Sequence, residues 1–189
     1  PATTTAAPAT TSAAPATTTA APATTTAAPA TTTTALDSTT TTTDSTQPQS
    51  DLDPLQVKGN KIVNAKGEEV SLQGMSLFWS QWMGKYYNSD CIAWLRNDWQ
   101  CEVVRVALAV EHKGYLENPS REYQKAEEVI QACIDQGIYV IVDWHSHHAE
   151  EQTDQAIEFF TRIASEYGDK PNIIYEIYNE PLNVSWDNV

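Results

Sequence analysis

The chain has 189 residues, with 11 Lys and Arg against 25 Asp and Glu, which gives a formal net charge of −14. An acidic protein repels phosphate groups, so we expect neither nucleic acid nor an anionic membrane surface as a partner. The sequence contains no run of 18 apolar residues and therefore predicts no transmembrane helix.

Residues 1–50 consist almost entirely of Ala, Thr, Pro, Ser, Asp and Gln, without an aromatic residue. Prolines at positions 1, 8, 15, 22 and 29 mark five copies of a seven-residue unit that has no apolar face. We therefore predict a disordered Pro/Thr/Ala-rich linker over residues 1–50 and a folded domain over residues 51–189. Tracts of this kind are typical of exported proteins, so we expect a secreted protein with a further module before Pro1.

The domain begins with a predicted hairpin over residues 56–72, whose turn is expected at residues 64–67. The first strand of a sheet is expected over residues 70–76, so the hairpin is placed to cover the floor of a barrel. A helix is predicted over residues 89–99, with its N-cap at residue 89 or 90.

Strands and helices then alternate along the chain. Strands are expected over residues 102–108, 138–143 and 173–180, and helices over residues 120–136 and 154–167, with Gly137 as a C-cap. This alternation indicates a parallel sheet with right-handed crossovers. Four such βα units are half of a TIM (β/α)8 barrel, since a whole barrel takes about 250 residues.

Polar side chains collect where these strands end. Arg105 lies in the second strand, His145 follows the third, and Asn179 and Glu180 follow the fourth. Barrel enzymes place their active sites at the C-terminal ends of the strands, so the sequence predicts a catalytic site at this end of the sheet.

Three of these strand ends also carry a resemblance to a known family. They are VRVA at residues 104–107, VDWHSH at residues 142–147 and IYNEP at residues 177–181. In this order they resemble glycoside hydrolase family 5, and most of all its bacterial endoglucanases (cellulases), over about residues 55–189.

The resemblance implies an endo-acting glycoside hydrolase that cleaves β-1,4-glucan with retention. Glu180 would be the general acid/base, and Asn179 would bind the 2-hydroxyl of the sugar being cleaved. Arg105 would hold the nucleophilic carboxylate ionised and oriented. His145 would hydrogen-bond the same sugar.

Three more residues are expected to contact the substrate by the same resemblance. Trp79 would be an aromatic platform for a sugar ring, His147 would support the mouth of the site, and Tyr115 is a second candidate platform. The expected partner is a β-glucan polysaccharide, bound by a monomer without a cofactor or a metal ion.

A retaining mechanism needs a second carboxylate about 5 to 5.5 Å from the first. Glu176 is excluded from this role, because four strand residues span about 13 Å. Asp143 is better interpreted as a buried partner of Arg105 or of a neighbouring donor. The resemblance places the nucleophile on a seventh strand outside these residues, so we expect the 189-residue chain alone to be inactive and poorly folded.

Several alternatives are open at this stage. The substrate could be mannan, xylan or mixed-linkage glucan, because cleft loops decide among these polysaccharides. Residues 145–148 (HSHH), with Asp143 and Glu150, could instead ligate the metal of a barrel hydrolase. The linker and the aromatic residues 78–82 equally fit a non-catalytic carbohydrate-binding protein. Cys91 and Cys101 could form a disulfide or remain free thiols.

Overall fold

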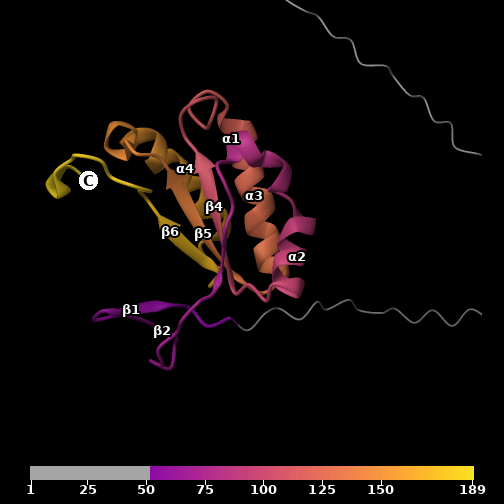
Figure 1. Cartoon of the computed structure of the whole chain (residues 1–189). Coiled ribbons are helices and arrows are strands. Elements are labelled where there is room, and N and C mark those ends of the chain that lie inside the picture. The colour runs from indigo at the N-terminus through magenta and orange to yellow at the C-terminus, as the bar shows by residue number, and fades with distance from the viewer. Residues whose placement is uncertain (1–51) are drawn as a thin grey trace, which may run out of the picture. The chain divides into compact units, whose positions relative to one another are not determined.

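The structure, a computed structural model, describes residues 52–189. The predicted linker at residues 1–50 lies outside the described residues. Four parallel strands form the centre of the described part, side by side and in chain order (Figure 1). They are β3 (Gly74–Ser76), β4 (Val103–Ala109), β5 (Tyr139–His145) and β6 (Ile173–Glu176).

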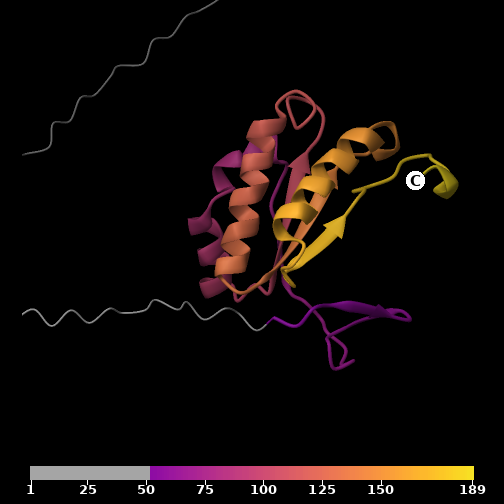
Figure 2. The same cartoon turned by 180° about the vertical axis from the view of Figure 1, so that it is seen from behind.

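Helices connect these strands, as the sequence predicts. They are α1 (Ser80–Met83), α2 (Ser89–Asp98), α3 (Pro119–Asp135) and α4 (Thr153–Tyr167), with short 3-10 turns η1 (Gly84–Tyr86), η2 (Ala149–Glu151) and η3 (Trp186–Asn188). Figure 2 shows α3 and α4 on the same face of the sheet. This arrangement of four βα units is the one expected for part of a barrel wall.

The two faces of the sheet differ in chemistry because successive strand residues point to opposite sides. The apolar side chains on the side of the helices are fully buried: Val104, Val106, Leu108, Val140, Val142 and Trp144. The alternate positions carry Arg105 in β4, Asp143 and His145 in β5, and Glu176 in β6. The register pairs Ala107 with Asp143 and Asp143 with Glu176, so the charged groups of three strands lie at neighbouring levels.

Helix α3 agrees closely with its prediction. The apolar positions Ala126, Val129, Ile130 and Cys133 are all fully buried. The C-cap residue is Gln136, and Gly137 follows it with φ +64°, the left-handed conformation that glycine favours after a helix.

The start of α2 differs from its prediction. The N-cap is Asn88, whose Oδ1 accepts a hydrogen bond from the backbone N–H of Cys91 at 2.9 Å. Ser89 and Asp90 lie in the first turn instead. The sequence offers three consecutive capping residues here, and only the path of the preceding chain decides which of them caps the helix.

The hairpin is also shifted from its prediction. Strands β1 (Gln56–Lys58) and β2 (Lys61–Val63) are antiparallel and turn at Gly59, which has φ +65°. The turn expected at residues 64–67 exists, but it leads only to a single bridge between Val63 and Glu69.

The hairpin nevertheless occupies its expected end of the sheet. Figure 1 shows β1 and β2 beyond the end of the sheet where the strands begin. Tyr139, the first residue of β5, donates a hydrogen bond from its hydroxyl to the carbonyl oxygen of Asp53 at 2.7 Å. The first strand of the sheet, β3, is shorter than the expected residues 70–76.

The last strand departs most from expectation. The apolar run predicted a strand buried on both faces up to residue 180, but β6 ends at Glu176. Tyr175 and Ile177 are 43% and 60% exposed, and Ile157 of α4 is 60% exposed. Strand β6 is one edge of the described sheet, and an apolar groove of about 530 Å³ lies between it and α4.

Two smaller expectations concern membrane helices and cysteine pairing. Among residues 52–189, no helix combines the length and the apolar character needed to cross a membrane. Cys91, Cys101 and Cys133 are free thiols, so the possible Cys91–Cys101 disulfide is not formed in this structure.

Candidate active site

The guanidinium group of Arg105 is the centre of the polar face of the sheet. Its Nε and Nη2 donate to the two carboxylate oxygens of Glu176 at 2.7 and 2.8 Å. Nη2 also lies 2.8 Å from Asn179 Oδ1 and 2.8 Å from Asp143 Oδ2. Arg105 therefore joins β4 to β5, to β6 and to the segment that follows β6. The Glu176 hydrogen bonds, together with the charges of Asp143 and Glu176, raise the pKa of Arg105 against the opposing effect of burial, so it stays protonated.

Asp143 contacts both Arg105 and His145 on the polar face of the sheet. Its side chain is fully buried, and Oδ2 lies 2.5 Å from His145 Nδ1 as well as near Arg105. The sequence prediction of a buried partner for Arg105 or a neighbouring donor is confirmed, since Asp143 contacts both. Burial raises the pKa of Asp143, and the contacts with His145 and Arg105 oppose this shift. Its other oxygen, Oδ1, is buried without a hydrogen-bond partner among the described residues.

Glu180 lies at the open end of this network. Its side chain is 73% exposed, and its Oε2 lies 3.5 Å from His147 Nδ1. The same nitrogen of His147 lies 3.2 Å from the backbone carbonyl oxygen of Glu180. The structure therefore brings His147 to Glu180, and Arg105 to the neighbouring Asn179.

Trp79 lies beside both histidines. Its ring centroid is 4.3 Å from that of His145, in an edge-on arrangement, and 5.9 Å from that of His147. Trp79 is half-buried. All the polar residues predicted from the strand ends are thus brought together with Trp79 at one end of the sheet.

Tyr115 does not join them, and its prediction as an aromatic platform is wrong. Only 6% of its surface is exposed, and its ring packs against Trp144 and Phe159 with centroids 5.3 and 5.5 Å away. The backbone N–H of Tyr115 donates a hydrogen bond to the carbonyl oxygen of Ala109, at the end of β4, at 2.8 Å. The ring therefore turns into the core under the helices and away from the polar face.

Sequence reasoning did not identify the carboxylate that supports the loop after β5. Glu111 Oε1 accepts hydrogen bonds from Ser146 Oγ and from Gln152 Nε2, both at 2.6 Å. Burial acts to raise the pKa of Glu111, but these hydrogen bonds hold it below its ordinary value. Glu111 lies two residues after the end of β4, and polar residues at strand ends line the site, so its position in the sequence could have indicated it.

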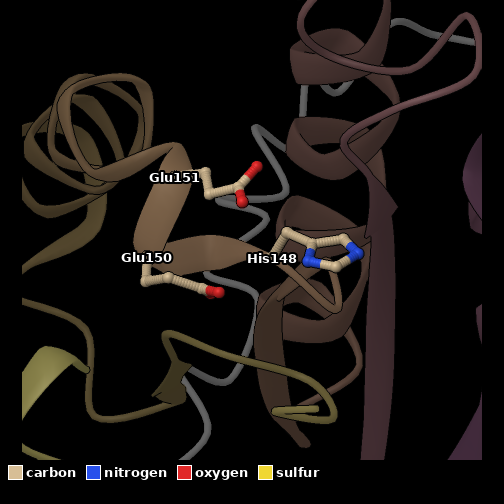
Figure 3. A group of neighbouring side chains, drawn as sticks. All are labelled: His148, Glu150 and Glu151. Atoms are coloured by element: carbon tan, nitrogen blue, oxygen red, sulfur yellow. The ribbon is translucent and has the colours of Figure 1, made fainter. Parts of the chain in front are cut away.

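One group of side chains could hold a metal ion. His148, Glu150 and Glu151 offer ligand atoms that all lie within 4.8 Å of one another, on the turn that follows β5 (Figure 3). The Glu150 carboxylate accepts a hydrogen bond from the Tyr178 hydroxyl. The group includes His148 and Glu150 of the metal-dependent alternative, but not His145, His147 or Asp143. It would therefore hold a cation beside the polar face rather than within it.

The comparison with known proteins decides the family. Residues 63–189 match the family described as Cellulase (glycosyl hydrolase family 5). This match covers more than half of the chain. The chain belongs to glycosyl hydrolase family 5.

Curated endoglucanases are similar to this chain over part of their length. Endoglucanase Z of Dickeya dadantii is 48% identical over 144 residues, which is 74% of this chain and 33% of that protein. Endoglucanase A of Evansella cellulosilytica is 46% identical over 127 residues, 65% of this chain and 26% of that protein. The chain thus spans about a third or less of the length of these curated relatives.

Solved structures agree with this assignment. A structure from Cytophaga hutchinsonii is 58% identical, with a TM-score of 0.70 over 71% of this chain and 44% of that one. The catalytic domain of Thermobifida fusca endoglucanase Cel5A (E5) is 33% identical, with a TM-score of 0.69 over 71% of this chain and 45% of that one. The described residues are therefore part of a family 5 TIM barrel.

Proposed function

We propose that these residues belong to a secreted, retaining endo-β-1,4-glucanase whose general acid/base is Glu180. The observation that carries the proposal is the bond network from Asp143 through Arg105 to Asn179, next to an exposed Glu180. This network fixes the segment after β6, which carries the exposed carboxyl group of Glu180. The names of the relatives, all endoglucanases, support a glucan as the substrate.

The orientation of Asn179 fits its proposed role. Its amide oxygen accepts from Arg105, so the amide NH2 group remains to donate to a ligand. In the proposed reaction that group binds the 2-hydroxyl of the sugar being cleaved, a contact that strengthens in an oxocarbenium-like transition state. Arg105 thus sets which end of the amide faces the substrate.

Glu180 would act twice. It protonates the departing glycosidic oxygen in the first step, and its carboxylate removes a proton from water in the second. His147 lies close enough to orient it. The nucleophile is proposed to be a glutamate of the seventh strand, held by Arg105. Within residues 52–189, Arg105 Nη1 has a single and long hydrogen bond, to Ser76 Oγ at 3.4 Å, which leaves donor capacity for that carboxylate.

Residues 1–50 are proposed to join this catalytic domain to another module outside the cell. Their composition supports a spacer, since it cannot bury a core. Mass analysis of the natural protein in the culture medium tests this proposal. A protein retained inside the cells would contradict it.

The proposed reaction predicts the stereochemistry of its product. The full-length protein should release a β-anomer first from a soluble β-1,4-glucan, which proton NMR detects before mutarotation. Initial release of the α-anomer would contradict retention. Turnover on xylan or mannan that exceeds turnover on β-1,4-glucan would replace the proposed substrate.

A further inference from the structure

The segment that carries Asn179 and Glu180 lies beyond the end of a strand. Strand β6 stops at Glu176, and its register with β5 stops there as well. Among the described residues, no backbone–backbone hydrogen bond involves residues 177–181. The position of the proposed acid/base therefore depends on side-chain contacts rather than on the hydrogen bonds of the sheet.

Tyr178 holds this segment from the side of the helices. Its ring packs against the buried core and lines the groove beside α4. Its hydroxyl donates to the carboxylate of Glu150 and lies 3.0 Å from the backbone carbonyl oxygen of His147. Both acceptors belong to the loop between β5 and α4. Tyr178 therefore bonds the residue next to Asn179 to the loop that carries His147.

His147 contacts the same segment at a second point. Its Nδ1 lies 3.2 Å from the backbone carbonyl oxygen of Glu180 and 3.5 Å from Glu180 Oε2. Its own carbonyl oxygen is the one that the Tyr178 hydroxyl reaches. One loop residue thus contacts the residues on both sides of Asn179, so a shift of this loop would move Glu180 with it.

The bond between Tyr178 and Glu150 joins a neutral donor to a charged acceptor. Burial and the hydrogen bond to Glu150 raise the pKa of Tyr178 to about 12. The Tyr178 hydroxyl in turn holds the pKa of Glu150 below its ordinary value. At neutral pH the phenol therefore keeps its hydrogen and the carboxylate keeps its charge. A hydrogen bond to an ionised acceptor is about twice as strong as one between neutral groups.

The loop that carries Glu150 is itself fixed. Ser146 and Gln152, one on each side of the turn, both donate hydrogen bonds to Glu111, which follows β4. The Ser146 hydroxyl also accepts from the backbone N–H of His148 at 2.9 Å. A catalytic group keeps its geometry only where the residues that support it are held in place as well. The loop meets this condition, so it can hold the segment after β6.

We infer that Glu150 and Tyr178 are positioning residues for the general acid/base. Their hydrogen bond ties the segment after β6 to the loop after β5, and so keeps Glu180 where it can protonate the departing glycosidic oxygen. This inference rests on the proposed function, since it assigns a support to the same carboxyl group. A displacement of about 1 Å, caused by a change away from the chemistry, can lower a rate about 100-fold.

The test uses two substrates that differ in their need for an acid. Cleavage of cellotetraose releases a sugar hydroxyl, which must be protonated, whereas 2,4-dinitrophenyl β-cellobioside releases a stable phenolate. The value of kcat/KM is measured for both substrates with the full-length protein, because it covers only the steps up to bond cleavage. Tyr178→Phe should lower kcat/KM about tenfold for cellotetraose and less than about twofold for the dinitrophenyl substrate.

Two substitutions test Glu150. Glu150→Ala removes the acceptor and should reproduce the loss caused by Tyr178→Phe. Glu150→Gln keeps an amide oxygen that can accept from the Tyr178 hydroxyl, so it should retain most of kcat/KM for cellotetraose. Combining Glu150→Ala with Tyr178→Phe should add little to either single loss, because both changes remove the same bond.

Tyr175→Phe is the matched control. Tyr175 precedes Tyr178 in the same segment and lines the same groove, and within the described part of the chain its hydroxyl forms no hydrogen bond. This variant should retain kcat/KM for both substrates. Equal losses of Tyr178→Phe on the two substrates would overturn the inference, since they would show only a support of the fold. A Tyr178→Phe protein that hydrolyses cellotetraose like the wild type would overturn it too.

Two further measurements keep the outcomes apart. Thermal unfolding shows whether each variant folds, and Glu150→Ala, a change in a surface turn, tests the inference even if Tyr178→Phe unfolds. Glu180→Gln should lose far more activity on cellotetraose than on the dinitrophenyl substrate. That result, with Tyr178→Phe and Glu150→Ala unaffected, would overturn the positioning role alone. Undiminished hydrolysis of cellotetraose by Glu180→Gln would overturn the proposed acid/base together with it.

Discussion

Arg105 of β4 and Glu176 of β6 form a fork of two hydrogen bonds across the intervening strand β5, with N···O distances of 2.7 and 2.8 Å. The two side chains are only 21% and 29% exposed. A planar guanidinium can engage both oxygens of a carboxylate at once, whereas an ammonium group cannot. The fork leaves Arg105 oriented to hold Asn179 as well.

Arg105→Lys should therefore lower kcat on a soluble β-1,4-glucan about 100-fold in the full-length protein, because Asn179 loses its fixed orientation. KM should change much less. Steady-state kinetics measure both quantities. Arg162→Lys is the matched control, since Arg162 pairs with Glu166 on the exposed surface of α4 and should tolerate the change. A kcat for Arg105→Lys within twofold of the wild type would contradict the role of the fork.

Glu180→Gln should abolish most turnover while retaining cellotriose affinity. The amide keeps the shape of the side chain but cannot transfer a proton, and general acid/base catalysis contributes about 10²- to 10⁴-fold. Kinetics on a soluble glucan and calorimetric titration give the two readouts. Glu158→Gln, on the exposed face of α4, should behave as the wild type. Undiminished turnover in Glu180→Gln would remove Glu180 as the acid/base.

Tyr115→Ala should lower the free energy of unfolding by about 3 to 5 kcal/mol, because it removes a buried ring between Trp144 and Phe159. Tyr115→Phe should be close to neutral, as the ring remains. Neither change should affect cellotriose affinity once the protein is folded. Urea denaturation and calorimetry test this. Lost affinity with unchanged stability would show that Tyr115 is a sugar platform after all.

Glu111 should make stability depend on acid pH. Its folded-state pKa lies below the ordinary value of 4.5, so its stabilising contribution is complete above that pH and is lost as the pH falls through the folded-state pKa. Glu111→Gln should reduce the free energy of unfolding by about 1 kcal/mol at pH 7 and by less at an acid pH below 4.5. Urea denaturation across this range measures the difference. An equal difference at both pH values would contradict the shift.

A polypeptide of residues 51–189 alone should self-associate. The groove between α4 and β6 exposes Ile157, Tyr175 and Ile177, and exposed apolar patches of this kind promote association. Sedimentation velocity should show oligomers, and Ile157→Ser with Ile177→Ser should shift them toward the monomer. Val57→Ser is the control, since Val57 is 82% exposed but lies on the hairpin. A stable monomer with a cooperative unfolding transition would refute this expectation.

Much of the fold could be predicted because it depends on local patterns. The buried face of α3 and the positions of β4 and β5 follow from the period of their apolar residues. Asp143 was correctly interpreted as a buried partner of Arg105, because residues two apart in a strand share a face. Tyr115 was misassigned, since its loop offers no periodicity to show which way the ring turns.

The amino-acid sequence by itself determined which elements form, in what order, and that Arg105, His145, Asn179 and Glu180 end up at one end of a parallel sheet. Only the tertiary structure decided that Arg105 also pairs with Glu176, because this contact joins residues 71 positions apart and depends on strand register. The exposure of β6 likewise depends on which surfaces meet in space, and local sequence does not encode that.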